Sequence, residues 1–189
     1  MVMSVYKSGV HCTLLGDGMV GKTCLARSFA DRTFPVNYVA TVMDTYSGTT
    51  YVDGNKYGIT LTDMAGEHDV IQTSDYTMTD VFIICYSVVD RESFESVQDF
   101  WAPQIKKIAK KRPVILVATQ TDLRQEGNIH HVTSLEGETL AKLMSANQFK
   151  ESSAFAKEGV SPLFKSVVHV SLKYHKKRCN IIKRVLNSI

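Results

Sequence analysis

The sequence predicts an α/β fold with a mainly parallel six-stranded sheet, one antiparallel edge hairpin and helices on both faces. Two observations support this. Short apolar runs alternate with stretches in which apolar residues recur at helical spacing. The runs at 81–87 and 114–118 are almost continuously apolar, which is typical of strands buried on both faces of a sheet. The 189 residues, 44% of them hydrophobic, are enough for one domain with a substantial core.

The expected elements follow in chain order. Strands are predicted at 10–15, 45–52, 57–61, 81–87 and 114–118, with a short one before Glu151. Asp53-Gly54 separates the second and third strands and predicts a tight hairpin. Helices are predicted at 23–30, 90–112, 133–146 and 161–178. Thr133 with Glu136 forms a capping box, and Ser161 is expected to cap the last helix with Pro162 at its first position.

Charge is unevenly distributed along the chain. The net charge is +3, yet the last seventeen residues hold six basic side chains and no acidic one, which leaves −3 for the rest. A mildly acidic body argues against a nucleic-acid-binding core. No secretion signal or membrane span is expected, and the four cysteines show no metal-binding spacing. We therefore expect a cytoplasmic protein with reduced thiols.

A phosphate-binding motif follows the first strand. Gly16-Asp17-Gly18-Met19-Val20-Gly21-Lys22-Thr23 matches G-x-x-x-x-G-K-[ST] and leads directly into a predicted helix. The glycines let backbone N–H groups face phosphate oxygens, Lys22 would bridge the β- and γ-phosphates, and the Thr23 hydroxyl would ligate Mg²⁺. The motif alone leaves GTPases, nucleoside kinases and ATPases open.

Three later segments narrow the choice. Asp63-Met64-Ala65-Gly66 ends the third strand, where Asp63 would hold Mg²⁺ through water and the Gly66 N–H would meet the γ-phosphate. Thr119-Gln120-Thr121-Asp122 occupies the place of a guanine loop, in which an aspartate accepts hydrogen bonds from the base N1–H and exocyclic amine. In Glu151-Ser152-Ser153-Ala154, a backbone N–H would meet the guanine O6. Together these segments predict guanine-nucleotide binding.

With these residues in place, the chain resembles the Ras-superfamily GTPases, and within them the Rho/Rac group, from about Val10 to Leu172. Further matches are Thr33-Phe34-Pro35, Tyr38, Thr41-Val42, Val52-Asp53-Gly54, Asp80-Val81-Phe82 and Trp101. The resemblance implies a P-loop NTPase of the small G-domain type over 1–178, followed by a basic amphipathic tail over 179–189.

The resemblance also implies residue roles. Thr41 would ligate Mg²⁺ and sense the γ-phosphate, and Phe34 would pack against guanine. Effector proteins would bind Tyr38 to Tyr46 and the loop after Asp63, while exchange factors and GTPase-activating proteins would set nucleotide occupancy. The predicted catalytic residues are Glu67, Lys22 and Thr41, and the predicted Mg²⁺ ligands are Thr23, Thr41 and Asp63. The predicted GTP/GDP-binding residues are Asp17, Gly18, Met19, Val20, Gly21, Lys22, Thr23, Cys24, Phe34, Tyr38, Thr41, Asp63, Gly66, Thr119, Gln120, Asp122, Leu123, Ser153 and Ala154.

Several residues depart from the family pattern. Glu67 stands where a glutamine usually orients the attacking water, so altered hydrolysis is expected. Gln120 replaces a lysine and Met19 a small residue, which predicts faster nucleotide exchange. Met43 stands at a commonly aromatic effector position. The stretch 122–137 is too short for the extra helix of the Rho group.

The tail departs too, because Leu186-Asn187-Ser188-Ile189 is no prenylation box. Apolar residues from Ile181 to Ile189 recur at helical spacing among cations, which fits a helix on an anionic membrane, on the cytosolic face of the plasma or internal membranes. A helix extension that packs on the body is the alternative, and palmitoylation of Cys179 is a further one.

The leading functional hypothesis is an atypical Rho-type switch that binds GTP or GDP with Mg²⁺ and hydrolyses GTP. It would signal to the cytoskeleton, cell polarity or membrane traffic. The alternative is a GTP-loaded binding scaffold in which Glu67 and Met19 leave turnover negligible. A P-loop kinase or ATPase is disfavoured by Asp122.

Overall fold

The computed structural model describes residues 9–31, 43–64, 76–109 and 111–186, with side chains as far as Ile181. Several predicted site residues lie outside these ranges, and their roles stay predictions. They are Phe34, Tyr38, Thr41, Gly66 and Glu67.

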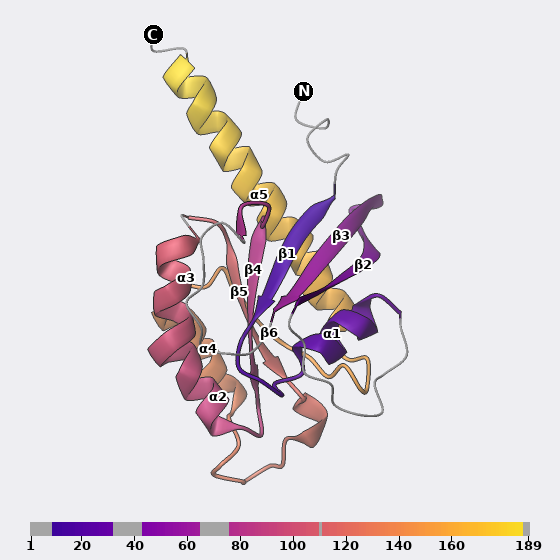
Figure 1. The fold of residues 1–189 in the computed structure, drawn as a ribbon, viewed down its shortest axis with the longest axis vertical. Coiled ribbons are helices and arrows are strands. Elements are labelled where there is room, and N and C mark those ends of the chain that lie inside the picture. Colours follow the sequence, from indigo (N-terminus) through magenta and orange to yellow (C-terminus); the bar gives the residue numbers. More distant parts are fainter. Residues whose placement is uncertain (1–8, 32–42, 65–75, 110, 187–189) are drawn as a thin grey trace.

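Six strands form one sheet in the order β2-β3-β1-β4-β5-β6 (Figure 1). Their bounds are β1 Val10–Leu15, β2 Met43–Val52, β3 Asn55–Met64, β4 Val81–Ser87, β5 Val114–Thr119 and β6 Gln148–Glu151. β2 and β3 pair antiparallel through the predicted hairpin, and the other neighbours are parallel. The predicted sheet is confirmed, and the carboxyl ends of the parallel strands meet at one edge, as in other open α/β sheets.

Helices cover both faces of the sheet (Figure 1). Their bounds are α1 Lys22–Phe29, α2 Arg91–Ser96, α3 Ala102–Ile108, α4 Ser134–Leu143 and α5 Val160–Leu186. α1 and α5 bury one apolar cluster, which includes Leu25 and Phe164, against one face. The other face carries α2, α3 and α4 over a second cluster that includes Trp101 and Leu140. The nucleotide-binding segments predicted from the sequence therefore follow strands whose central members, β1, β4 and β5, are buried between helices.

The sequence predicts one continuous helix at 90–112, and this prediction is wrong. A π-helical segment, Val97–Trp101, separates α2 from α3, and α3 ends at Ile108. Pro103 accounts for the interruption, because proline offers no N–H to the carbonyl four residues earlier and its ring crowds that carbonyl. The start is as expected, since the Asp90 carboxylate accepts a hydrogen bond from the Ser93 N–H.

The sequence predicts the start of α4 correctly but not the start of α5. The capping box of α4 is confirmed, since Glu136 N–H donates to Thr133 Oγ1 and Thr133 N–H donates to Glu136 Oε2. The expected cap at Ser161 is wrong because α5 begins at Val160. Gly159 precedes it with φ of +72°, and a Cβ there would lie 2.1 Å from the Glu151 carbonyl oxygen. Glycine therefore sets this boundary.

α5 continues unbroken past residue 178 as far as Leu186, and its end projects beyond the sheet (Figure 1). The division into 1–178 and 179–189 stays a prediction. Across the described part of the chain, no helix combines the length and the apolar character needed to cross a membrane.

Candidate functional site

The predicted phosphate loop joins the carboxyl end of β1 to the start of α1. Gly16 has φ of +132°, and a Cβ there would lie 2.1 Å from the Cys85 carbonyl oxygen, so only glycine lets the loop pass β4 this closely. Gly21 caps α1 with φ of +87° and has no side chain to occupy the first N–H groups of the helix. With no acidic residue in its first turn, this helix terminus favours an anion.

Lys22 is held inside the loop that it follows. Its side chain is buried, and Nζ donates to the carbonyl oxygens of Gly16 at 2.7 Å and Asp17 at 2.6 Å. Burial lowers the pKa of Lys22, and this is opposed by the nearby Cys85, Asp63 and Asp17. An anionic ligand in the loop would offset the cost of burying this ammonium group.

Thr23 and Asp63 come together from α1 and β3, forty residues apart in sequence. The Thr23 hydroxyl donates to Asp63 Oδ2 at 2.5 Å. Asp63 is fully buried, and its Oδ1 has no hydrogen-bond partner within the described residues. Burial raises the pKa of Asp63, while the Thr23 bond and Lys22 lower it. A hydroxyl beside a buried carboxylate with an unused oxygen fits Mg²⁺, which prefers oxygen ligands. Thr41, the third predicted ligand, lies outside the described residues.

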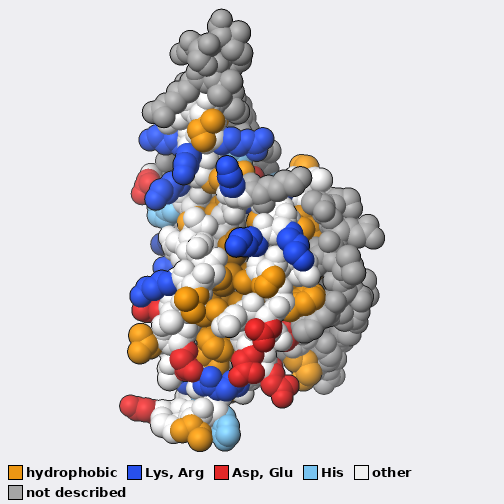
Figure 2. Space-filling model, turned by 90° about the vertical axis from the view of Figure 1, so that its left-hand side faces the viewer, with side chains coloured by type: hydrophobic (Ala, Val, Ile, Leu, Met, Phe, Trp, Pro, Cys, Tyr) orange, Lys and Arg blue, Asp and Glu red, His pale blue; other side chains and the backbone are white. Residues whose placement is uncertain are grey.

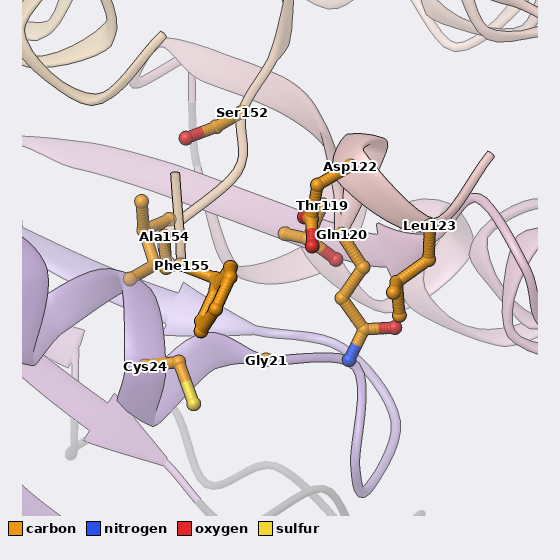
Figure 3. Close-up of a pocket in the computed structure, with 10 residues that line it drawn as sticks. Gly21, Cys24, Thr119, Gln120, Asp122, Leu123, Ser152, Ala154 and Phe155 are labelled. Carbon is orange, nitrogen blue, oxygen red and sulfur yellow. The ribbon is translucent and has the colours of Figure 1, made fainter. Parts of the chain in front are cut away.

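A cavity of about 260 Å³ opens beside the phosphate loop, between α1, the segment after β5 and the segment after β6 (Figure 3). Seven of its lining residues were predicted from the sequence. They are Gly21, Cys24, Thr119, Gln120, Asp122, Leu123 and Ala154. Figure 3 shows Phe155 and Cys24 on one side of the cavity, with Gln120 and Leu123 on the other. The shape and the position of Asp122 suit a nucleobase next to the phosphate loop.

Sequence reasoning missed two lining residues, Leu25 and Phe155, and named a third, Ser152, only as part of the base-contacting tetrapeptide 151–154. Phe155 directly follows the predicted Ala154, and 74% of its surface is exposed. A large aromatic residue next to a base-reading segment is a signal that could have been noticed, since aromatic faces stack on bases. Nothing in the sequence pattern marks Leu25 as anything but a core residue of α1.

Gln120 connects the base pocket to the phosphate loop. Its Nε2 donates to the Met19 carbonyl oxygen at 3.2 Å, and its Oε1 accepts a 2.5 Å hydrogen bond from the Ser87 hydroxyl. The position usually held by lysine therefore still reaches the phosphate loop, through a neutral hydrogen bond. Met19 has φ of +62°, a left-handed conformation that costs a side chain free energy, and its side chain is 73% exposed.

Three predicted nucleotide-binding residues use their side chains within the protein. Thr119 Oγ1 lies 2.5 Å from the Val20 carbonyl oxygen, so it anchors the phosphate loop to β5. Ser153 is fully buried, and its hydroxyl accepts from the Ala156 N–H at 2.9 Å. The Asp17 carboxylate accepts from Trp101 Nε1 at 2.6 Å. The Asp17 carboxylate and the Ser153 hydroxyl are therefore already engaged within the protein.

One prediction about the effector segment is wrong at a single residue. Tyr46 is 1% exposed and belongs to the core, because alternate residues of β2 face the sheet interior. Met43, at the start of the same edge strand, is 65% exposed and remains available. The segment between Leu123 and Ser134 forms turns and no helix, as its length predicted.

A phosphate loop with a buried lysine lies at the carboxyl edge of a parallel sheet. Beside it are a Thr–Asp pair whose oxygens fit Mg²⁺ and a pocket whose shape suits a nucleobase. This arrangement is typical of P-loop nucleotide-binding proteins. A model of the Ras family matches residues 11–173, and the chain belongs to that family. It is therefore a small GTPase, a class of nucleotide-binding switch. Ras-family proteins bind GTP and GDP with Mg²⁺ and interact with effectors, exchange factors and GTPase-activating proteins.

Proposed function

We propose that this chain is an atypical Rho-type switch that binds GTP and GDP with Mg²⁺ and hydrolyses GTP at an altered rate. It would signal to the cytoskeleton, cell polarity or membrane traffic. The observation that supports nucleotide switching best is the buried Lys22 beside the Thr23–Asp63 pair, at the same edge as Asp122. The Rho-type assignment rests on the sequence matches described above.

In this proposal each residue has a defined task. Lys22 and the N–H groups of the phosphate loop hold the phosphates, and Asp122 accepts hydrogen bonds from the guanine edge. Thr23, Asp63 and Thr41 hold Mg²⁺, which supplies positive charge against the phosphate oxygens. Glu67 would orient or deprotonate the attacking water.

Glu67 also supports the alternative, a GTP-bound scaffold with negligible turnover. An ionised carboxylate cannot donate the hydrogen bond that glutamine gives to the γ-phosphate. In that case Tyr38 to Tyr46 and the loop after Asp63 would bind effectors persistently, and exchange factors or abundance would control signalling.

One experiment separates these functions. The purified protein is assayed for its bound nucleotide, for competition by GTP against ATP, and for phosphate release from preloaded GTP in a single turnover with Mg²⁺. Preference for GTP with measurable release supports the enzyme, while stable bound GTP supports the scaffold. Equal competition by ATP would contradict the guanine assignment of Asp122.

The location is proposed as cytoplasmic or peripheral on a cytosolic membrane face. Lys and Arg side chains gather around the projecting end of α5 (Figure 2). Lys173, Lys176, Lys177 and Arg178 are exposed, as is Ile181. Removal of residues 181–189 is expected to weaken binding to anionic vesicles, whereas equal binding would favour a tail that packs on the domain.

A further inference from the structure

We propose that Arg124 is a positioning residue that holds the two base-contacting segments together, so that nucleotide residence time and selectivity for guanine depend on it. The inference rests on the proposed function, because it concerns the same pocket. Arg124 touches neither the pocket nor the phosphate loop, and it would act through the segments that it joins.

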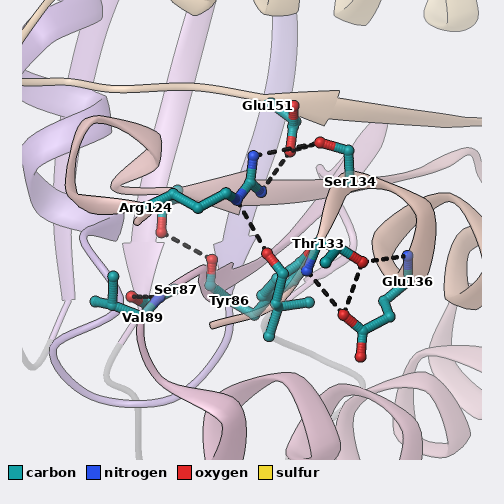
Figure 4. A network of polar contacts seen from close by, with 10 residues as sticks. Tyr86, Ser87, Val89, Arg124, Thr133, Ser134, Glu136 and Glu151 are labelled. Atoms are coloured by element: carbon teal, nitrogen blue, oxygen red, sulfur yellow. Dashed lines mark hydrogen bonds and ion pairs between the residues drawn. The ribbon is translucent and has the colours of Figure 1, made fainter. Parts of the chain in front are cut away.

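The two segments are joined by one guanidinium group (Figure 4). Arg124 directly follows the turn Thr121–Leu123, which carries Asp122. Glu151 ends β6 and directly precedes the pocket residues Ser152 and Ala154. Arg124 Nη2 lies 2.6 Å from Glu151 Oε1, and the same oxygen accepts from the Ser134 hydroxyl at 2.9 Å.

The backbone connects these segments well only where the strands end. Ser152 N–H donates to the Ala118 carbonyl oxygen at 2.9 Å, which continues the pairing of β5 with β6. Thr121 N–H donates to the Ser152 carbonyl oxygen at 3.5 Å, the long limit for a hydrogen bond. Beyond Ser152 the chain bonds to itself, since the Ser152 hydroxyl and the Ser153 N–H both donate to the Glu158 carbonyl oxygen at 3.0 Å. Past the strand ends, the position of Asp122 relative to Ala154 therefore relies on the Arg124–Glu151 connection together with the long Thr121–Ser152 bond.

The Arg124 side chain is itself fixed in place. Nε donates to the Val132 carbonyl oxygen at 3.0 Å and Nη1 donates to the Ser134 hydroxyl at 3.3 Å. The side chains of Arg124 and Glu151 are 22% and 32% exposed, so water screens their attraction only in part. A charge-assisted bond held at both ends gives geometric precision, which a base-reading aspartate requires.

The chain contains a matched control pair. Arg91 Nη1 lies 2.9 Å from Glu136 Oε1, with side-chain exposures of 33% and 38%. This pair has similar chemistry and exposure, but it joins α2 to α4. Arg91 Nη2 also donates to the His131 carbonyl oxygen, and its hydrogen bonds to Glu136 and His131 both lie outside residues 121–123 and 152–154. Loss of an ion pair can therefore be separated from loss of this particular connection by comparing Arg124→Gln with Arg91→Gln.

The experiment measures dissociation of GDP and of inosine diphosphate, which lacks the exocyclic amine that Asp122 would read. Arg124→Gln is expected to speed GDP release about tenfold, the effect of losing one charge-assisted hydrogen bond, and to bring the two dissociation rates closer together. Arg91→Gln should leave both rates and their ratio unchanged. Arg124→Lys should recover part of the loss, and Glu151→Gln should repeat it. Phosphate release from preloaded GTP should keep its wild-type rate in all four variants.

The inference would be overturned if Arg124→Gln and Glu151→Gln both kept the wild-type ratio of the two dissociation rates. It would also be overturned if Arg91→Gln changed that ratio as much as Arg124→Gln does. Unfolding temperatures at saturating GDP identify any variant that fails to fold, in which case Arg124→Lys and Glu151→Gln decide. Wild-type protein that binds GDP no better than ADP would overturn the proposed function and this inference with it. Wild-type preference for GDP with an unchanged variant ratio would overturn the inference alone.

Discussion

The phosphate side and the base side of the site are built in opposite ways. On the phosphate side, Lys22 and Asp63 are buried, at 6% and 0% exposure, and one contiguous loop supplies most of the contacts. On the base side, Asp122 and Phe155 are exposed, and the lining residues come from three separate segments. Substitution of a buried charged residue is therefore expected to have a large effect on nucleotide binding. Substitutions in the exposed segments on the base side are expected to change binding by smaller amounts.

The largest effect is expected on the phosphate side, at Lys22. Lys22→Met removes the buried ammonium group and leaves the Gly16 and Asp17 carbonyls without this donor. GDP affinity should fall by roughly 100-fold or more, since a hydrogen bond to a charged group contributes about 1.5–3 kcal/mol and this residue would make several. Titration with a fluorescent GDP analogue measures it. Lys165→Met, at an exposed position of α5, is the control and should change nothing. If Lys22→Met and Lys165→Met bound GDP with similar affinity, the buried Lys22 would matter no more for binding than an exposed lysine, which would contradict this prediction.

Asp63 tests the metal on the same side of the site. Asp63→Asn keeps the shape of the side chain but removes the buried charge. Because Asp63 would hold Mg²⁺ through water, Mg²⁺ affinity should fall by about 10- to 100-fold, the usual cost of losing a residue that contacts the metal indirectly. GDP release measured with and without EDTA reports the change. EDTA should accelerate release from wild-type protein and have little further effect on the variant. Asp53→Asn in the β2–β3 hairpin is the matched control, and a wild-type EDTA response in Asp63→Asn would contradict the assignment.

Gln120 lies between the two sides and should give a moderate effect. Lysine at this position would replace the neutral bond to the Met19 carbonyl oxygen with a charged one. Gln120→Lys should therefore slow GDP release, by about fivefold if the charge adds about 1 kcal/mol. Stopped-flow release assays measure this. Gln125→Lys adds the same charge on an exposed turn and is expected to leave release unchanged. Equal rates for wild type and Gln120→Lys would show that the neutral bond already suffices.

The smallest effect is expected at the control pair outside the site. The hydrogen bond from Arg91 lowers the pKa of Glu136 from 4.5 to about 2. Burial acts in the opposite direction, and hydrogen bonds from Thr133 add to the lowering. A carboxylate whose pKa is lowered by folding stabilises the protein fully above pH 4.5, and this contribution is lost as pH falls toward 2. Arg91→Gln should therefore make the loss of stability between pH 5 and pH 3 slightly shallower.

Urea unfolding midpoints at the two pH values measure that difference. Glu138→Gln, on the exposed side of α4, should retain the wild-type pH response. An unchanged slope in Arg91→Gln would mean that the ion pair contributes nothing in solution, as is common for exposed pairs.

Much of the fold could be predicted because its patterns are local. Strand periodicity, the Asp53-Gly54 turn and the Thr133 capping box depend on neighbouring residues, and each is confirmed. The start of α5 was missed because it depends on a contact in the folded protein. Gly159 packs against the Glu151 carbonyl oxygen at the end of β6, and no pattern in the sequence shows this contact. The π-helical segment before Pro103 was missed because periodicity alone does not show how a helix accommodates proline.

The candidate site divides in the same way. The phosphate loop, the position of Asp63 and the order of the base-reading segments could all be read from the sequence. Each is a short motif of particular residue types that directly follows a strand, so neighbouring residues are enough to identify it. By contrast, the folded structure was needed to show that Tyr46 is buried, that Phe155 lines the pocket and that Arg124 joins the two base segments. These features depend on which side chains meet across the sheet edge, and that information is carried by packing between distant residues.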